Sequence, residues 1–373
     1  MVLAAAALVA AGCLGIAHSE QLAESDGRFL RQQFVWAALA AVAMILVTIP
    51  NYRLLCRWSY AALAMSIVLL AAVYFFPPVN GARRWIRVGP VGLQPSEFAK
   101  VAFVLAMARW LMYRENYRRL SGLLAPLLLT LLPVVLILRE PDLGTALVFL
   151  PVLLVMLLAA GARKRHLALL CLLSLATLPV LWTQMSREQK SRVTAMWEET
   201  SPGVRPSDDA YHLHQSKRML ALGGWWGSSR VSDESPEEIS DELSAAHLDY
   251  YIPAAHTDSI FSVLGHRYGL AGLVALLSLF VLLIWRGTMV AAATREPFGR
   301  LVALGLVALL GVQVVINTAM LVGLLPITGL SLPLVSYGGS GLVAHAIALG
   351  LILNIGLRPG YELAGEPFRF AGE

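Results

Sequence analysis

The chain has 373 residues, of which 57% are hydrophobic and 14% charged, and its mean hydropathy is +0.67. Soluble domains carry about 25% charged residues, so this composition excludes an ordinary soluble enzyme. The net charge of +5 is a surplus that the cytoplasmic loops of a membrane protein can account for, and we expect no nucleic-acid partner. The cysteines, Cys13, Cys56 and Cys171, form no CxxC pair, so we expect neither a disulfide nor a zinc site.

Predominantly apolar runs recur from one end of the chain to the other, and they predict ten transmembrane helices. The runs cover approximately residues 2–17, 34–49, 58–76, 98–113, 123–138, 143–160, 167–184, 270–285, 301–323 and 342–357. The first run lacks the basic segment of a signal peptide, so we interpret it as a membrane helix. We therefore predict one all-α polytopic membrane domain over residues 1–373.

The basic residues of the short loops predict the orientation of these helices, because such residues are retained in the cytoplasm. With the N-terminus inside, the cytoplasmic loops hold about twice as many arginines and lysines as the opposite short loops. Both termini are therefore predicted to be cytoplasmic. The long segment 185–258 then lies outside the membrane, and a loop of this length is usually functional.

Two stretches of different composition lie within this outer loop. Residues 211–226 are basic and aromatic, which suits either a short helix in the headgroup layer or a loop resting on the membrane, and we favour the loop. Residues 233–242 are acidic, and we expect them to be solvated and partly disordered.

Four polar clusters lie where the outer loops meet the bilayer, and ionisable residues there are costly enough to mark functional sites. In the first, Arg83 and Arg84 precede a helix start that contains Ser96, Glu97 and Lys100. We interpret Ser96 as the N-cap, and the arginines with the helix N-terminus as a cradle for a phosphate-like anion. The alternative is that the arginines only snorkel at the interface, beside a simple ion pair of Glu97 and Lys100.

Carboxylates mark the next two clusters. Glu140 and Asp142 lie in a tight turn before an apolar run, where simple helix capping is the favoured explanation. His256, Thr257 and Asp258 lie where the outer loop returns to the membrane. Asp258 could act as a general base if burial tunes its pKa, or it could cap the following helix, and both alternatives stay open.

The fourth cluster is a segment rich in glycine and proline at 325–340, which suits a re-entrant loop that lines a cavity. Its candidate polar side chains are Ser336, Tyr337 and Ser340. Gln313 and Asn317, one turn apart in the preceding run, are expected to hydrogen-bond between helices. His345 is expected to be a hydrogen-bonded interior histidine rather than a ligand.

The motifs GARRWI, QPSEFAK, EPDLGTAL, HTDSIF, GLLPITG and SYGGS follow one another in this order. Together they closely resemble the SEDS family of bacterial shape, elongation, division and sporulation proteins, over nearly the whole chain. The resemblance is closer to the elongation branch of the family than to the division branch. It implies a peptidoglycan glycosyltransferase that polymerises lipid II on the outer face of the inner membrane. The implied partners are a class B penicillin-binding protein transpeptidase and other elongation-complex membrane proteins.

The resemblance also implies roles for particular residues. In the family, the aspartate of the HTD motif is essential for polymerisation, which makes Asp258 the expected catalytic residue. The residues expected to bind the substrate are Arg83, Arg84, Glu97, Lys100, Glu140, Asp142, His256, Thr257, Ser336, Tyr337 and Ser340.

The implied reaction is the attack of an acceptor sugar hydroxyl on the anomeric carbon of a donor that leaves with a lipid-linked diphosphate. Asp258 would remove the proton. The groups expected to neutralise the diphosphate are Arg83, Arg84 and Lys100, with Glu97 positioning the lysine. A Mg²⁺ ion that bridges Glu140 or Asp142 and the diphosphate is the one cofactor that these residue types suggest.

Other functions compete with this interpretation. A transporter that flips lipid II would need polar groups through the full depth of the membrane, whereas here they concentrate at one face. A noncatalytic scaffold for a transpeptidase would leave the arginine and carboxylate clusters unexplained. A division-specific role within the same family is a further alternative.

Overall fold

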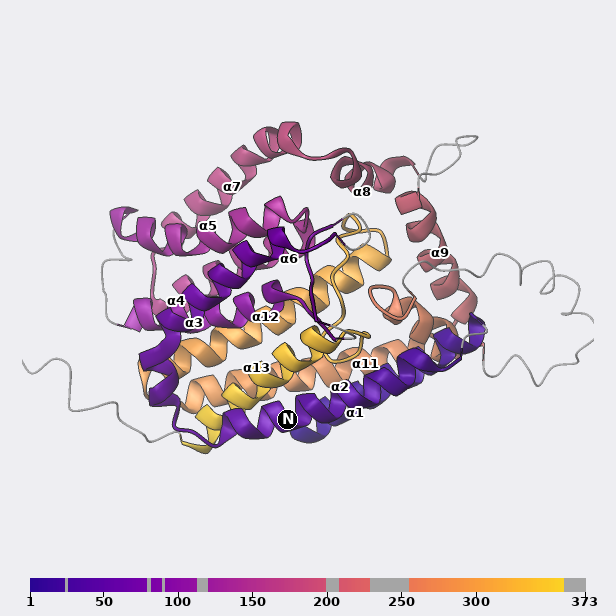
Figure 1. The fold of residues 1–373 in the computed structure, drawn as a ribbon, viewed down its shortest axis with the longest axis horizontal. Coiled ribbons are helices and arrows are strands. Elements are labelled where there is room, and N and C mark those ends of the chain that lie inside the picture. Colours follow the sequence, from indigo (N-terminus) through magenta and orange to yellow (C-terminus); the bar gives the residue numbers. More distant parts are fainter. Residues whose placement is uncertain are drawn as a thin grey trace, which may run out of the picture.

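The computed structural model describes residues 1–23, 26–78, 82–88, 91–112, 120–198, 208–228 and 255–358, and it is almost entirely helical (Figure 1). The acidic stretch 233–242 lies outside the described residues, as does the C-terminal segment after Arg358. Predictions about those two segments therefore stay predictions.

Every one of the ten predicted apolar runs coincides with a helix. These helices are α1 (Val2–Leu22), α2 (Arg28–Thr48), α3 (Tyr52–Ala72), α4 (Pro95–Met112), α5 (Leu124–Arg139), α6 (Leu143–Ala160), α7 (Lys164–Gln184), α11 (Ile260–Ala293), α12 (Pro297–Leu321) and α13 (Gly339–Leu357). Among the described residues, seven helices are long and apolar enough to cross a membrane: α1, α2, α3, α6, α11, α12 and α13. The all-α polytopic fold is thereby confirmed, with α5 as a shorter apolar helix and α4 as one that carries charges.

The outer loop contains two helices, α8 (Arg187–Glu198) and α9 (Asp208–Gly223). The membrane-resting loop that we favoured for residues 211–226 is wrong, because most of this stretch is helical and packs against α11. Burial of Leu213 and Met219 on one face of α9 explains why the stretch folds as a helix rather than lying extended. Trp225 and Trp226, just beyond it, are 73% and 61% exposed, as interfacial tryptophans would be.

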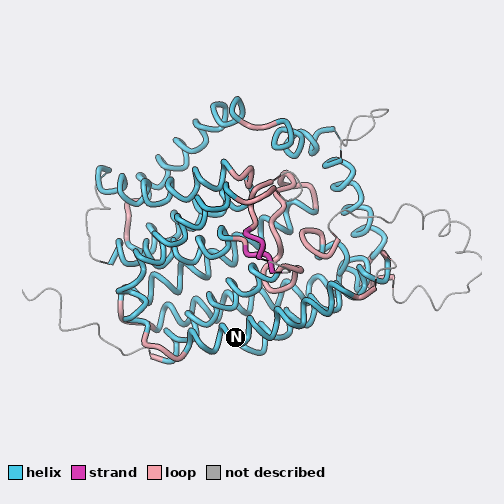
Figure 2. Tube along the Cα trace, viewed as in Figure 1, coloured by secondary structure: helices cyan, strands magenta, loops and turns pink. Residues whose placement is uncertain are grey.

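A two-stranded antiparallel hairpin, which the sequence analysis did not predict, joins α3 to α4. Its strands are β1 (Ile86–Val88) and β2 (Val91–Leu93), with Ile86 opposite Leu93. Figure 2 shows this hairpin and most of the loop backbone gathered on the side of the bundle nearest α8 and α9. Short 3₁₀ turns, Val73–Phe75 and Leu120–Leu123, lie at the end of α3 and before α5.

Helix α12 is the centre of the bundle and packs against α4, α6 and α11 (Figure 1). Helix α13 packs along α2, and two glycines permit the close approach. A Cβ atom on Gly350 would stand 2.7 Å from the Met44 carbonyl oxygen, and one on Gly339 would stand 2.0 Å from the Trp36 ring. Small residues at such contacts are the usual means by which membrane helices pack closely.

Helix α11 begins ten residues earlier than the sequence predicted, because it continues through a kink. Gly269 lies at the kink with a φ of +67°, a backbone conformation that favours glycine. The chain leaving α9 is hydrogen-bonded to this kink, where Leu270 N donates to the Gly224 carbonyl (2.9 Å) and Ala271 N to the Trp225 carbonyl (3.1 Å). The kink therefore anchors the outer-loop helix α9 on the membrane bundle.

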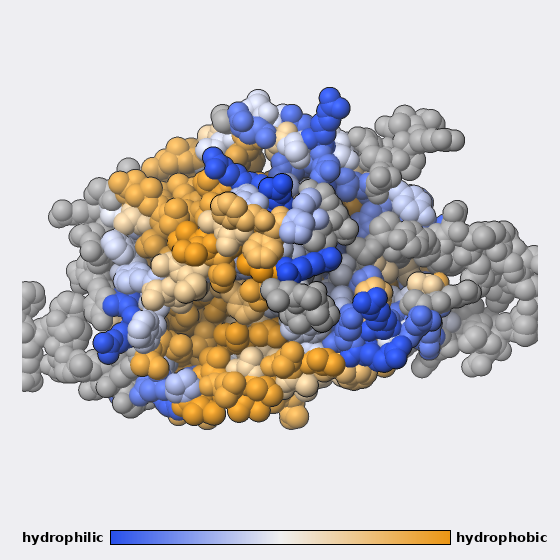
Figure 3. Space-filling model, viewed as in Figure 1, coloured by the Kyte–Doolittle hydropathy of each residue, from blue (hydrophilic) through white to orange (hydrophobic). Residues whose placement is uncertain are grey.

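The outer surface of the bundle is apolar over a broad band (Figure 3). Large hydrophobic side chains are exposed there, including Leu46 of α2, Leu132 of α5, Leu175 of α7 and Val281 of α11. Hydrophilic patches bound this band in the view. Such a band suits contact with lipid hydrocarbon.

Candidate active site

The loop between α12 and α13 meets the turn before α11 at one end of the bundle. Asn317 of α12 holds both, because its Nδ2 donates to the Asp258 carbonyl (2.9 Å) and to the Leu330 carbonyl (2.6 Å). Tyr337 N donates to the His256 carbonyl (2.8 Å). The third and fourth predicted clusters therefore form one site. Asn317 bridges backbone segments rather than helices, so the expected helix-to-helix bond is wrong for this residue.

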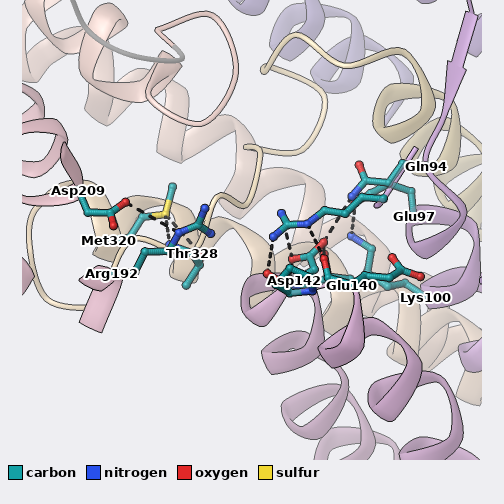
Figure 4. Close-up of polar contacts among 12 residues, drawn as sticks. Gln94, Glu97, Lys100, Glu140, Asp142, Arg192, Asp209, Met320 and Thr328 are labelled. Atoms are coloured by element: carbon teal, nitrogen blue, oxygen red, sulfur yellow. Dashed lines mark hydrogen bonds and ion pairs between the residues drawn. The ribbon is translucent and has the colours of Figure 1, made fainter. Parts of the chain in front are cut away.

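The first and second predicted clusters also meet. Arg84 donates to the Glu140 carbonyl (3.0 Å) and to the Pro141 carbonyl, and its Nη1 lies 3.9 Å from Asp142 Oδ1. Gln94 Nε2 lies 3.5 Å from Asp142 Oδ2. Figure 4 shows Gln94, Glu140 and Asp142 close together, apart from a second group that includes Arg192 and Thr328.

Contacts between the two halves show that they share one end of the bundle. A Cβ atom on Gly144, at the start of α6, would stand 2.5 Å from the Thr328 carbonyl oxygen. One on Gly341, at the start of α13, would stand 3.7 Å from Glu97 Oε2. The Gly- and Pro-rich loop thus packs against both halves, as a re-entrant loop would.

Asp258 is half-buried and does not cap α11. The N-cap residue is Ser259, which makes no side-chain capping bond, and the Ser259 hydroxyl is instead hydrogen-bonded to His212 of α9 (2.7 Å). Among the described residues, the Asp258 carboxylate accepts no hydrogen bond and forms no ion pair within 4.0 Å. Its Oδ2 lies 3.6 Å from the Cβ position of Gly329, a space that stays free because glycine has no side chain. The helix-cap alternative is therefore wrong.

His256 lies two residues before Asp258 and is held by aromatic contacts. Its ring stacks on Phe29 of α2 at a centroid distance of 4.1 Å and meets the edge of Tyr337 at 5.5 Å. Burial lowers the pKa of the His256 imidazole, and the nearby Asp258 and Glu20 carboxylates oppose this shift. The ring is therefore mostly neutral at pH 7.

The serines of the SYGGS segment differ in their surroundings. Ser336 Oγ accepts from Leu332 N (2.7 Å), and its carbonyl accepts from Gln33 Nε2 (3.4 Å), so it holds the loop together. Tyr337 donates its hydroxyl to Gln32 Oε1. The Ser340 hydroxyl is buried and has no hydrogen-bond partner among the described residues. Thr257, half-buried, lies between His256 and Asp258.

Glu97 and Lys100 form a buried ion pair in the first turns of α4. Their Oε1 and Nζ atoms are 2.8 Å apart, and the two side chains are 5% and 2% exposed. Ser96 is not the N-cap, because α4 begins at Pro95 and the Ser96 hydroxyl has no partner among the described residues. Proline has no backbone N–H group. With Pro95 at the helix start, the first turn therefore has one fewer donor for a cap to satisfy.

A polar contact between α12 and α13 lies next to this pair. His345 Nδ1 donates to the Gly341 carbonyl (2.6 Å), and its Nε2 lies 2.8 Å from Gln313 Oε1. His345 is thus the hydrogen-bonded interior histidine that we expected. The expected helix-to-helix bond of Gln313 is confirmed as well.

Glu140 is fully buried, and neither carboxylate oxygen has a hydrogen-bond partner among the described residues. Burial raises the pKa of this carboxyl to about 8, helped by the charge of Asp142 and opposed by Arg84. Glu140 is therefore protonated at neutral pH. Asp142 caps α6 by accepting from Thr145 N (3.1 Å) and Thr145 Oγ1 (2.9 Å), which confirms the capping explanation for this residue.

The donor set of this turn does not fit the suggested Mg²⁺ ion. Both Asp142 oxygens already contact protein donors, the Glu140 carboxyl is neutral, and the positive Arg84 guanidinium lies 3.9 Å from Asp142. No group of three or more histidine, cysteine, aspartate or glutamate side chains in the described part of the chain could hold a metal ion.

Two of the predicted diphosphate ligands, Arg84 and Lys100, contact other groups of the protein in this structure. Arg84 bonds backbone carbonyls, and Lys100 is buried against Glu97. Arg83 is exposed, and its Nη1 donates to the Tyr74 carbonyl (2.9 Å). In the described part of the chain Arg192 of α8 lies near Asp258, since both reach the Cβ position of Gly329 within 4 Å. The sequence analysis missed this residue, because nothing in the sequence relates the outer-loop helix to the HTD motif.

The chain resembles proteins of known type over its full described length. The FtsW/RodA/SpoVE family model, described as cell cycle protein, matches residues 1–358. The chain is 34% identical over 338 residues to the probable peptidoglycan glycosyltransferase FtsW of Geobacter metallireducens, covering 88% of this chain and 85% of that protein. It is also 34% identical over 320 residues to the peptidoglycan glycosyltransferase MrdB of Escherichia coli K12, covering 85% and 83%.

Solved structures give the same picture. The rod shape determining protein RodA of Thermus thermophilus superposes with a TM-score of 0.70 at 30% identity, covering 97% of each chain. A chain solved in work on the structural coordination of polymerization and crosslinking by a peptidoglycan synthase complex superposes with a TM-score of 0.80. That match has 32% identity and covers 97% of this chain and 98% of the other.

Proposed function

Because the chain belongs to the FtsW/RodA/SpoVE family of cell cycle proteins, we propose that it is a peptidoglycan glycosyltransferase that builds glycan strands from lipid II. The observation that carries the proposal is the half-buried Asp258 carboxylate, which lies beside Gly329 at the end of the bundle where the turn before α11 meets the loop after α12. Asn317 bonds the backbone carbonyl of Asp258 and not its side chain, so the carboxylate stays available to a substrate.

In this mechanism an acceptor hydroxyl attacks the anomeric carbon of the donor, and the bond from that carbon to the diphosphate breaks. The electron pair leaves with the diphosphate oxygen, and the hydroxyl proton passes to Asp258. General base catalysis of this kind contributes typically about 10² to 10⁴ in rate. The neutral His256 ring, stacked on Phe29, limits the freedom of the turn that carries the base.

Stabilisation of the charge that develops on the diphosphate is expected to contribute more to the rate than general base catalysis does. Arg83 is exposed and bonds only the Tyr74 carbonyl among the described residues, so its guanidinium keeps donors for a phosphate. Arg84 and Lys100 act indirectly. Arg84 orders the turn at Glu140, and the charge of Lys100 is neutralised by Glu97. These two residues therefore shape the site rather than contact the diphosphate directly.

The distribution of polar residues through the bundle favours polymerisation over transport. On α12 the residues from Leu301 to Val312 are all apolar, which is about 18 Å of helix without a polar side chain. The stretches Val101–Ala108 of α4 and Ala346–Leu353 of α13 are equally apolar. A lipid-linked sugar crossing the membrane would meet no polar path along these helices.

The proposed setting is the bacterial inner membrane, with both termini in the cytoplasm and the active site outside. The proposed role is elongation, supported by the similarity to RodA of Thermus thermophilus. The proposed partners are a class B penicillin-binding protein transpeptidase and other elongation-complex membrane proteins, supported by the superposition on a chain of a peptidoglycan synthase complex.

The test is polymerisation of lipid II by the purified full-length protein, with and without its transpeptidase partner, read as glycan strands on a gel. The Asp258→Asn variant is the matched control. Proteoliposomes with lipid II in the inner leaflet test the competing function, since a transporter would expose the lipid outside without lengthening it. Flipping without polymerisation would reject the glycosyltransferase.

A further inference from the structure

Arg192 lies beside the candidate base although it belongs to a separate helix of the outer loop. Its Nη1 is 3.7 Å from the Cβ position of Gly329, and Asp258 Oδ2 is 3.6 Å from the same point. These two distances limit the separation of the charged ends to at most about 7.3 Å, and no ion pair within 4.0 Å joins them in the described part of the chain. Apart from Gly329 and its two chain neighbours, no other atom of the described residues lies within 4 Å of that point, so a carboxylate and a guanidinium face one shared space.

Arg192 is held only loosely by the protein. Its Nε lies 3.9 Å from Asp209 Oδ1 of α9, and each of the two side chains is 27% exposed (Figure 4). Asp209 is itself bonded on its other oxygen by Ser191 Oγ (2.8 Å). A partly exposed pair at this distance contributes little to stability, and the guanidinium keeps most of its donors for another partner.

The spacing of Arg192 and Asp258 suits the two ends of a displacement at a sugar carbon. The attacking and leaving groups occupy opposite faces of the ring, so a base and a leaving-group ligand must stand apart with the sugar between them. A guanidinium is also the cation best shaped to grip a phosphate with two parallel hydrogen bonds.

We propose that Arg192 binds the diphosphate of the lipid-linked substrate opposite Asp258 and stabilises it as it leaves. This inference rests on the proposed function and assigns to the outer-loop helix α8 the direct contact that Arg84 and Lys100 do not make. Gly329 completes the arrangement, because any side chain there would fill the space between the two charges and would be strained by the positive φ.

The test measures binding of undecaprenyl diphosphate to the full-length protein in detergent by tryptophan fluorescence. Arg192→Gln should weaken binding roughly 10- to 100-fold, because charge-assisted contacts to phosphate are lost, and Arg192→Lys should fall in between. Arg187→Gln, an exposed arginine on the same helix, is the matched control and should bind normally. Undecaprenol, which has the tail without phosphate, should bind wild type and Arg192→Gln alike.

Asp209→Asn separates ligand binding from a structural role. If Arg192 only fastens α8 to α9, this variant should lose as much affinity as Arg192→Gln, and that result would overturn the inference. If Arg192 binds phosphate, Asp209→Asn should keep or improve the affinity. Affinity of Arg192→Gln within twofold of wild type, with unchanged thermal unfolding, would also overturn it.

Failure of the inference and failure of the proposed function are distinguishable. Wild type that polymerises lipid II while Arg192→Gln binds undecaprenyl diphosphate normally refutes only the role of Arg192. Wild type that binds the diphosphate through Arg192 and never polymerises lipid II refutes only the glycosyltransferase.

Discussion

Single carboxyl groups in this protein behave differently because their surroundings differ. Among the described residues, the half-buried Asp258 carboxylate accepts no hydrogen bond and the buried Glu140 carboxyl has no partner, whereas both Asp142 oxygens are bonded. All three are carboxyl groups, but their hydrogen bonding and burial differ. These differences make Asp258 a candidate base, Asp142 a helix cap and Glu140 a neutral acid.

Replacement of the candidate base tests the residue-scale argument most directly. Asp258→Asn keeps the size of the side chain and the Asn317 bond to the backbone carbonyl, but it cannot take a proton. We expect lipid II polymerisation to fall by about 10² to 10⁴, with unchanged thermal unfolding in detergent. A variant that polymerises at the wild-type rate would show that the base lies elsewhere.

Glu140 makes a pH-dependent contribution to stability that can be measured. Its pKa is raised from the ordinary 4.5 to about 8 in the folded protein, so folding keeps it protonated while the unfolded chain ionises. This stability is fully present below about pH 4.5 and is lost as the pH rises through 8. Glu140→Gln does not titrate, so its unfolding temperature should gain on wild type between pH 5 and pH 8.

A gain that is the same at both pH values would contradict the buried, neutral state of Glu140. The matched control is Asp142→Asn. This change removes a carboxylate that accepts from the Thr145 amide and hydroxyl, so it should lower the unfolding temperature at both pH values.

At the scale of elements, the bundle depends on helices that approach one another closely at glycines. Gly350 of α13 faces the Met44 carbonyl of α2, where backbone atoms cannot move aside as a flexible side chain would. Gly311 of α12 provides a contrast, because the nearest atom to its Cβ position is the end of the Ile284 side chain at 3.5 Å.

These two glycines make a matched pair for mutation. Gly350→Val should separate α2 from α13 and cost about 1–3 kcal/mol, seen as a lower unfolding temperature in detergent. Gly311→Val adds the same atoms to a helix interior with ordinary contact distances, so it should cost less. Equal losses from both variants would mean that valine itself, rather than the α2–α13 contact, lowers the stability.

At the scale of the whole molecule, the orientation in the membrane decides whether the candidate site faces lipid II outside the cell. The charge asymmetry predicts that α9 is outside and the α6–α7 turn inside. His214 of α9 and Lys164 at the start of α7 are both exposed, which makes them suitable labelling positions.

Cysteine labelling in spheroplasts can determine the orientation. In a background without Cys13, Cys56 and Cys171, a membrane-impermeant thiol reagent should label His214→Cys in intact cells. Lys164→Cys should react only after lysis. The opposite pattern would place the site in the cytoplasm and invert the topology.

The sequence by itself determined the membrane class, the helical structure of the ten apolar runs and the family. Lipid cannot hydrogen-bond the backbone, so each apolar run must form a helix whatever its neighbours are. The motifs likewise pointed to Asp258 and to both carboxylates of the 140–142 turn as candidate site residues without the three-dimensional structure. The sequence was therefore sufficient for features that depend on a single segment, such as whether an apolar run forms a helix.

Only the tertiary structure decided which polar groups meet. Arg84 bonds the Glu140 and Pro141 carbonyls, and Lys100 is buried against Glu97, contacts that their charges alone did not predict. Arg192 came beside Asp258 because α8, the turn before α11 and the loop after α12 converge at Gly329. Such a meeting depends on how separate helices pack, since no segment carries the positions of the others in its own pattern.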